Sequence, residues 1–211
     1  MMQTKTTQGR LRIELTGVGK RFGRHWIIRD LSEVFTSGSQ IGIRGRNGSG
    51  KSTLLRLLCG QLTPSRGQID FSIEGKKVSA GNIYQHISWT GPYLEIVEEL
   101  TISDFLRFHF TLKPLLPHIE LAAVPALLEL DQVRNRKLSD CSSGMRQRVL
   151  LGSALYADTS LLLLDEPTVT LDEEAITWFQ QQLAANRDDR LVIIASNDEQ
   201  DLVGCERVLA L

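Results

Sequence analysis

The hydrophobic and polar positions of the first 91 residues predict several short strands and one helix. Apolar and polar residues alternate at positions 11–16, and apolar side chains recur through 26–35, so these two segments are expected to pair in a small antiparallel sheet. A glycine-rich loop then separates a short strand from a helix over 51–59, which ends at Gly60. The strands expected in this part are 11–16, 26–35, 40–42, 68–73 and 87–90.

The spacing of apolar residues becomes helical after Thr101. Apolar side chains recur three or four positions apart from Ile102 to Phe108, and Thr101 with Asp104 has the pattern of a helix cap. Prolines interrupt the following segment, but the pattern still predicts helices over 121–130 and 143–156. Strands and helices alternate again in the last part of the chain. Strands are expected at 161–164, 191–195 and 207–211, and a helix is expected over 173–185.

This order of elements predicts the fold class. We expect an α/β protein with a mostly parallel sheet, a small N-terminal antiparallel β subdomain and an inserted helical subdomain. All of 1–211 is expected in one domain, with 1–91 and 156–211 in the α/β core and 92–155 in the helical subdomain.

Composition narrows the class of protein. With 211 residues, 42% of them hydrophobic, the chain has enough apolar surface for one core. Its 24 Lys and Arg residues nearly balance 25 Asp and Glu residues, which argues against a dedicated nucleic-acid-binding protein. The three cysteines include no Cys-x-x-Cys pair, so disulfides and zinc are not expected. The polar residues 1–10 and the lack of a long apolar run predict a chain that does not itself enter a membrane.

A phosphate-binding motif lies between the strand at 40–42 and the helix over 51–59. Residues 45–52 match G-x-x-x-x-G-K-[ST], which predicts a P-loop NTPase core whose backbone N–H groups bind phosphate oxygens. Lys51 would place its charge at the β- and γ-phosphates, and Ser52 would bind Mg²⁺. The alternative is a glycine-rich turn that only connects two elements. The nucleotide-binding residues expected here are Gly45, Arg46, Asn47, Gly48, Ser49, Gly50, Lys51, Ser52 and Thr53.

Two carboxylates follow the buried strand expected at 161–164. Asp165 would hold Mg²⁺ through water, and Glu166 would orient or deprotonate the water that attacks the phosphate. Ligands bind at the carboxyl edge of a parallel sheet, where both residues are expected. The alternative is a strand followed by a solvated turn. The phosphate loop earlier in the chain favours the nucleotide site.

Together these motifs resemble those of the ATP-binding cassette (ABC) family, the ATPase subunits of ABC transporters. The distinguishing segment is 141–148, Cys-Ser-Ser-Gly-Met-Arg-Gln-Arg, which resembles the family signature LSGGQ and the helix after it. Its Ser142 stands 23 residues before Asp165. The alternative is that Ser142 or Ser143 only caps a helix, and both roles can hold, because a helix N-terminus with serine hydroxyls is also an anion site.

The resemblance implies a pair of cassettes that forms on ATP binding, either as a homodimer or with a different cassette. In the family, the signature of one subunit covers the γ-phosphate bound to the phosphate loop of the other. The residues expected to act in this way are Ser142, Ser143, Gly144 and Met145.

Two further positions take their expected roles from the resemblance. Residues 168–172 resemble the D-loop, in which Asp172 would touch the opposite subunit near the phosphates. Phe22 stands where the family places an aromatic ring that stacks on adenine. Without the resemblance, a lone Phe is more often a core residue.

Two positions depart from the family pattern. Asn197 follows the strand at 191–195 where the family usually has a switch His; an amide donates a hydrogen bond but carries no charge. Its alternative role is helix capping before Asp198. Pro92 stands where the Q-loop Gln is usual, and the nearby Gln85 has no assigned place in the site.

These departures imply slow hydrolysis. Lys51 and Glu166 remain, while two polar supports are altered. Loss of one positioned hydrogen bond costs a factor of about 10²–10³ in rate. The expected catalytic residues are therefore Glu166, Lys51 and Asn197, with ATP and Mg²⁺ as ligands.

The leading interpretation is an ATP-binding and ATP-hydrolysing subunit that powers transport of an unknown substrate through a separate integral membrane permease. It would be cytoplasmic and peripheral on the inner face of the cell membrane, with no nucleic-acid partner. The expected docking surface comprises Tyr93, Leu94, Ile96, Val97 and 100–110, although packing within the subdomain would also explain these apolar residues. The alternative function is a soluble ABC ATPase in nucleic-acid maintenance or cofactor assembly, without a permease.

Overall fold

A computed structural model describes residues 9–92 and 94–211 of the chain. These residues form two compact units. The sheet unit comprises 9–89, 159–167 and 188–211, and the helical unit comprises the described residues of 90–158 together with 168–187. Residues 168–187, which the sequence placed in the α/β core, thus have their contacts in the helical unit. Residues 1–8 and Tyr93 of the expected docking surface lie outside the described residues.

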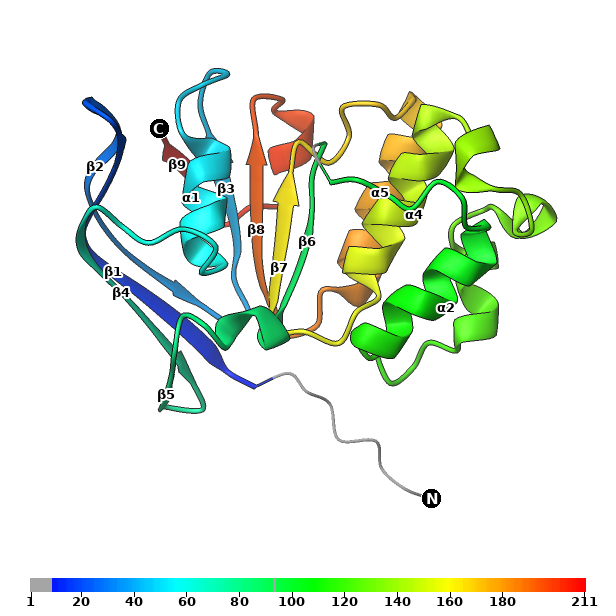
Figure 1. Ribbon diagram of the computed structural model, residues 1–211, viewed down its shortest axis with the longest axis horizontal. Coiled ribbons are helices and arrows are strands. Elements are labelled where there is room, and N and C mark those ends of the chain that lie inside the picture. The colour runs from blue at the N-terminus through cyan, green and yellow to red at the C-terminus, as the bar shows by residue number, and fades with distance from the viewer. Residues whose placement is uncertain (1–8, 93) are drawn as a thin grey trace. The chain divides into compact units, whose positions relative to one another are not determined.

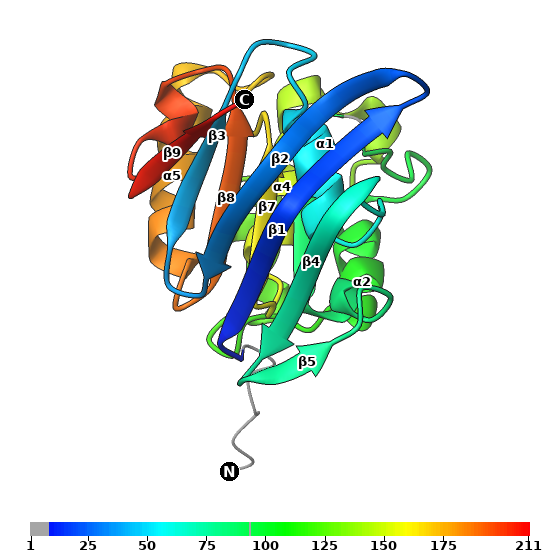
Figure 2. The same cartoon turned by 90° about the vertical axis from the view of Figure 1, so that its left-hand side faces the viewer.

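The first sheet of the sheet unit is antiparallel, as the alternating pattern predicts. It has the strand order β2-β1-β4-β5, and Figure 2 shows its long strands side by side. The sequence did not predict β5, because its three residues are too few to show alternation. Strand β5 follows a turn in which Glu74 and Gly75 have φ of 50° and 72°. The strands are β1 (Leu11–Phe22), β2 (His25–Thr36), β4 (Arg66–Ile73) and β5 (Lys76–Val78).

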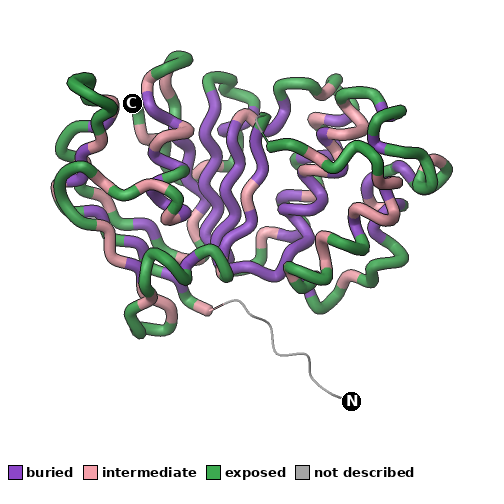
Figure 3. Tube along the Cα trace, in the orientation of Figure 1, coloured by how far each residue is buried: buried purple, intermediate pink, exposed green. Residues whose placement is uncertain are grey.

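The second sheet has five strands in the order β6-β7-β8-β3-β9. The pairs β7–β8, β8–β3 and β3–β9 are parallel. Strands β7 and β8 are buried along their whole length (Figure 3), which explains why they consist of continuous apolar residues instead of alternating ones. The strands are β3 (Gln40–Arg44), β6 (Ile87–Thr90), β7 (Leu161–Asp165), β8 (Leu191–Ser196) and β9 (Arg207–Ala210).

Helix α1 (Lys51–Leu58) lies between the two sheets (Figure 1). Its leucines 54, 55, 57 and 58 are almost fully buried and belong to one core with side chains of β1, β3, β7 and β8. Burial of a leucine side chain contributes about 1.5–3 kcal/mol. This packing holds the N-terminus of α1 at the carboxyl end of β3. The two sheets and their helices confirm the expected α/β class with an N-terminal antiparallel sheet.

The helical unit is built around α2 (Ile102–Leu112), α4 (Ser143–Leu155) and α5 (Glu173–Asn186). Helices α4 and α5 pack side by side (Figure 1). The Tyr156 hydroxyl donates to Gln182 Oε1 at 2.9 Å, and Trp178 Nε1 donates to the Leu127 carbonyl at 2.8 Å. The expected capping pair is present, since Thr101 Oγ1 accepts from the Asp104 amide at 3.1 Å.

The expected helix over 121–130 is wrong. The structure has a 3₁₀ turn at Leu121–Ala123 and then a single helical turn, α3 (Val124–Leu127). Pro125 lacks an amide hydrogen and fits only the first turn of a helix, so the two short pieces do not merge. Glu129, with φ of 58°, ends the segment in a left-handed conformation. The other 3₁₀ turns are Ile83–His86, Asp131–Val133, Leu138–Asp140 and Gln200–Leu202.

Within the described ranges, no helix combines the length and the apolar character that a bilayer crossing requires.

Candidate functional site

The phosphate loop connects β3 to α1, which is the strand-loop-helix context that the motif requires. Gly50, the residue before α1, has φ of 112°, and a Cβ there would stand 2.7 Å from Cγ2 of Ile27. A Cβ on Gly45 would stand 2.2 Å from Ser49 Oγ. Ser49 Oγ itself is buried and has no hydrogen-bond partner among the described residues. The loop is therefore packed too closely for side chains at two of its glycines, while it leaves a polar atom for a ligand or water.

The Lys51 side chain connects the phosphate loop with the carboxylates at the end of β7. Its side chain is only 6% exposed; Nζ donates to the Gly45 carbonyl at 2.8 Å and lies 3.1 Å from Glu166 Oε1. A buried ammonium is costly unless it is paired. The two residues expected to act on the γ-phosphate and on water thus form one ion pair in the sheet unit.

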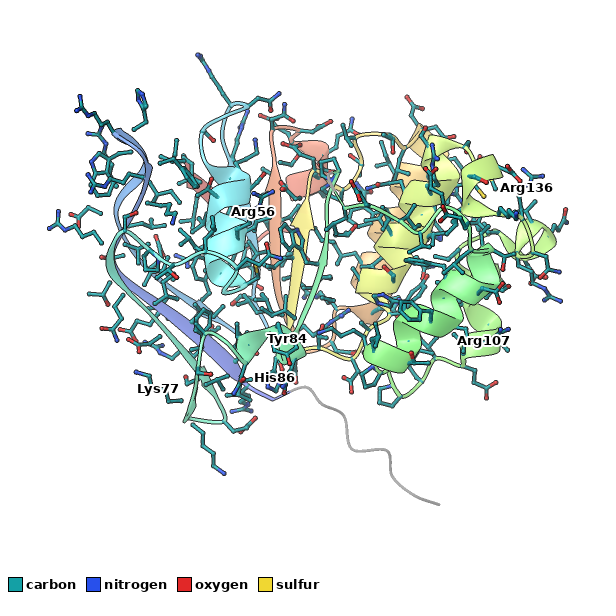
Figure 4. The ribbon with its side chains drawn as sticks, viewed as in Figure 1. Arg56, Lys77, Tyr84, His86, Arg107 and Arg136 are labelled. Carbon is teal, nitrogen blue, oxygen red and sulfur yellow. The ribbon has the colours of Figure 1, made fainter. Side chains whose placement is uncertain are left out.

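Asp165 and Ser52 have the chemistry of a magnesium site. Asp165 is 3% exposed, and its Oδ1 has no hydrogen-bond partner in the described ranges. Burial raises the pKa of Asp165 above 3.8; the hydrogen bond with Ser52 lowers it, the Glu166 charge raises it, and the charges of Lys51 and Arg56 lower it. Figure 4 shows Arg56 on α1.

These residues fit Mg²⁺ bound with a nucleotide. No cluster of three or more His, Cys, Asp or Glu side chains suited to a metal is found in the described part of the chain. Mg²⁺ usually takes only one or two protein oxygens, because phosphates and waters complete its octahedron. One unpartnered carboxylate oxygen beside a hydroxyl therefore suffices.

Glu166 is held at both carboxylate oxygens. Besides the Lys51 contact, its Oε2 accepts from Ser196 Oγ at 2.8 Å and from the Asn197 amide at 3.4 Å. Its φ of 46° is left-handed, and its own amide donates to the Ala195 carbonyl at 2.8 Å. Ser196 was not among the sequence candidates. Its position at the end of a buried strand, next to a candidate residue, is the signal that would have suggested it.

Asn197 contacts this network through its backbone amide, which donates to Glu166 Oε2. Its side chain is exposed, and the N-cap residue of the following turn Gln200–Leu202 is Glu199; Asp198 Oδ1 accepts from the Gln200 amide at 2.9 Å. Asn197 thus does not take its alternative role as a cap. Its catalytic role stays a prediction.

Phe22 is not a core residue. It is 50% exposed at the end of β1, and Lys20 Nζ lies 5.3 Å from the ring centroid. An exposed ring is available for stacking, so the adenine contact stays a prediction.

In the helical unit, the signature segment begins α4. Ser142 Oγ accepts from the Met145 amide at 3.2 Å, so the capping role considered for Ser142 is present. Ser142 and Ser143 are both exposed, and Cys141 is buried with Sγ donating to the Lys137 carbonyl at 3.3 Å. A cap at an exposed helix N-terminus is compatible with the predicted phosphate contact.

The remaining predicted positions lie on exposed turns. Asp172 caps α5, because its Oδ1 accepts from the Ala175 amide at 2.8 Å. Pro92 is exposed in the helical unit. Gln85 belongs to the sheet unit, where its Nε2 donates to Tyr84 Oη at 3.4 Å; Tyr84 is labelled in Figure 4.

Comparison with known proteins decides the family. A family model described as "ABC transporter" matches residues 28–169, which include the phosphate loop, the signature segment and the β7 carboxylates. The chain belongs to the ABC transporter family. It contains an ATP-binding domain of that family, as the motifs indicated.

Two curated ABC relatives show what the chain is similar to. It is 30% identical over 204 residues to the Nod factor export ATP-binding protein I of Bradyrhizobium diazoefficiens, covering 94% of this chain and 67% of the relative. It is 30% identical over 186 residues to the sulfate/thiosulfate import ATP-binding protein CysA of Escherichia coli, covering 80% of this chain and 49% of the relative. The chain thus spans about half to two thirds of their lengths.

A solved structure agrees with the fold of this ABC domain. A putative ABC transporter ATP-binding protein from Pyrococcus furiosus superposes with a TM-score of 0.79 at 22% identity, covering 95% of this chain and 97% of that one. At this identity the likeness concerns the fold alone.

The cap at α4 makes a prediction for this ABC domain. Ser142→Ala is expected to lower the free energy of unfolding by about 1 kcal/mol, because the Met145 amide loses its acceptor. Urea denaturation followed by circular dichroism measures the change. Ser143→Ala is the matched control, with an expected change within about 0.5 kcal/mol. Equal losses in both variants would contradict the assignment of Ser142 as the cap.

The buried Asp165 carboxylate makes a second prediction. Because its pKa is raised, the folded protein binds this proton more tightly than the unfolded chain does, and the ionised form disfavours folding. In EDTA without nucleotide, Asp165→Asn is expected to be more stable than the wild type at pH 7. The difference should shrink as the pH falls through the raised pKa and vanish below about 3.8, the ordinary value.

An opposite control lies on β4. The Lys77 hydrogen bond lowers the pKa of the partly exposed Asp70, so Asp70→Asn should be slightly less stable than the wild type at pH 7. Denaturation at a series of pH values measures both variants. A loss of stability in Asp165→Asn at pH 7 would contradict the inferred cost of the buried charge.

Proposed function

We propose that the chain is an ATPase subunit that binds ATP with Mg²⁺, pairs with a second cassette and drives transport through a separate permease. The observation that carries this proposal is the buried contact between Lys51 of the phosphate loop and Glu166 after β7. It joins a phosphate-binding cation and a carboxylate able to act on water.

Each candidate site residue of the sheet unit has a distinct role in this proposal. The amides of the phosphate loop and Lys51 bind the phosphates, and Ser52 with Asp165 holds the metal. Bound Mg²⁺ neutralises charge on the phosphate oxygens during transfer. Glu166 accepts a hydrogen bond from the attacking water and orients it, because its carboxylate lies 3.1 Å from the ammonium that binds phosphate. Phe22 stacks on the adenine.

Two substitutions in the family pattern set the expected rate. The amide of Asn197 replaces a residue that carries charge, and Pro92 offers no side-chain hydrogen bond. Glu166 and Lys51 keep the chemistry possible. We therefore propose that hydrolysis is slow.

The second cassette completes the site. The exposed Ser142 at the N-terminus of α4 would contact the γ-phosphate on a partner's phosphate loop, together with Ser143, Gly144 and Met145. Asp172, which caps α5, would lie near the same phosphates. ATP thus acts as part of the interface between the two cassettes.

The permease is proposed to dock on the helical unit. An open groove there is lined by Leu94, Ile96 and Leu150 with three glutamates, 95, 98 and 99, and Arg146. Val97 beside it is 47% exposed. The named relatives include one exporter and one importer, so the direction of transport differs among proteins similar to this chain.

The catalytic assignment is tested with Glu166→Gln. The amide keeps a similar shape but is a poor proton acceptor, so kcat is expected to fall at least about 100-fold, with ATP affinity changed little. Steady-state phosphate release and ATP binding are the measurements, and Glu14→Gln on β1 is the exposed control. Unchanged turnover in Glu166→Gln would refute the role of Glu166.

The same variant tests the pairing of cassettes. With ATP and Mg²⁺ it is expected to sediment as a dimer, because the bound nucleotide is not hydrolysed. A species that stays monomeric at saturating ATP would refute the proposed trans contact.

The permease is tested by co-purification of the tagged chain from detergent extracts. A polytopic membrane protein is expected to co-purify with the wild type and to be lost from Val97→Asp, because a charge in the docking surface is costly to desolvate. Leu112→Asp, at an exposed α2 residue outside that surface, should retain it. Recovery of soluble proteins or nucleic acid alone would favour the function without a permease.

A further inference from the structure

We propose that Ser196 and Asp201 are positioning residues that hold the Glu166 carboxylate in its working orientation. The inference rests on the proposed function, in which Glu166 acts on water. It adds two residues that none of the motifs contains.

The three side chains form a continuous hydrogen-bonded chain in the sheet unit. Ser196 Oγ lies 2.8 Å from Glu166 Oε2 and 2.6 Å from Asp201 Oδ2. Ser196 is fully buried and Asp201 is 4% exposed, whereas Glu166 is 19% exposed. This series of hydrogen bonds therefore runs from the partly exposed Glu166 through Ser196 to the buried Asp201.

Strand pairing and a short turn determine the position of the serine. Strands β7 and β8 pair with Asp165 opposite Ala195, which brings Glu166, just after β7, alongside Ser196, the last residue of β8. The Asp198 amide donates to Ser196 Oγ at 3.0 Å. Asp201 lies in the 3₁₀ turn Gln200–Leu202 that follows. The hydroxyl is thus held by backbone and side chain together.

The hydroxyl has one proton for two carboxylate contacts. That hydroxyl lies within hydrogen-bond distance of both carboxylates and can donate to either of them. The ammonium of Lys51 lies 3.1 Å from the other carboxylate oxygen of Glu166, Oε1. Glu166 is thus contacted at one oxygen by Lys51 and at the other by Ser196, and Asp201 contacts the same serine hydroxyl.

This arrangement matters when nucleotide binds. Lys51 must then share its ammonium with phosphate oxygens, so its hold on Glu166 Oε1 weakens. The Ser196 hydroxyl remains on Oε2 and keeps the carboxylate directed. A loss of orientation in a catalytic group lowers the rate of the chemical step much more than it lowers substrate affinity.

Turnover of the purified chain tests the serine. Ser196→Ala is expected to lower kcat by a factor of about 10–100 and to change KM for ATP by less than about twofold. Ser196→Thr, which keeps the hydroxyl, should regain most of the lost turnover. The matched control is Ser88→Ala, which removes another buried hydroxyl, 2.9 Å from Thr159 Oγ1, and should keep wild-type kcat.

Two variants at position 201 test the contact between Asp201 and Ser196. Asp201→Asn keeps a polar side chain of the same shape that can hydrogen-bond to Ser196 Oγ, so kcat should stay within about threefold of the wild type. Asp201→Ala removes this contact and should resemble Ser196→Ala. Equal losses in the Asn and Ala variants, or equal losses in Ser196→Ala and Ser88→Ala, would overturn the proposal.

Crystal structures give a measurement independent of turnover. In the wild type, Glu166 Oε2 is expected within hydrogen-bond distance of Ser196 Oγ, and in Ser196→Ala the Glu166 carboxylate should leave that position. An unmoved carboxylate in Ser196→Ala would overturn the proposal. Absence of ATPase activity in the wild type, with the carboxylate displaced in Ser196→Ala, would instead refute the proposed function and leave the positioning established.

Discussion

The buried ion pair between Lys51 and Glu166 is the interaction on which the site depends. The ammonium is only 6% exposed, and its partner in turn contacts Ser196. Removing the Glu166 carboxylate would leave the Lys51 ammonium as an unpaired buried charge, which typically costs about 3–5 kcal/mol. The phosphate loop, the end of β7 and the end of β8 are therefore energetically coupled before any nucleotide binds.

The packing of α1 makes this pair possible. Its leucines fill the space between the antiparallel and the parallel sheets, so the helix cannot shift without opening the core. Gly50 allows the loop to enter the helix in a left-handed conformation close to Ile27. The position of the Lys51 ammonium thus follows from apolar packing on both sides of the helix.

In the helical unit, stability and expected function depend on the same atoms. Ser142 and Asp172 each accept a backbone amide at the start of a helix. Helix N-termini need such acceptors, and they also attract phosphate. A family motif at a helix start can therefore serve as a cap in the free protein and as a phosphate contact in the proposed dimer.

The sequence by itself determined the fold class, the phosphate loop, the β7 carboxylates and nearly all the long elements, because apolar periodicity and glycine spacing are local properties. It failed at 121–130, where Pro125 divides an apolar stretch, and at the three-residue strand β5. Only the tertiary structure decided that Ser196 lies against Glu166 and that Asp201 lies against Ser196. The contact between Ser196 and Glu166 depends on the register of β7 and β8; the two residues are 30 positions apart along the chain, and no local pattern encodes that register.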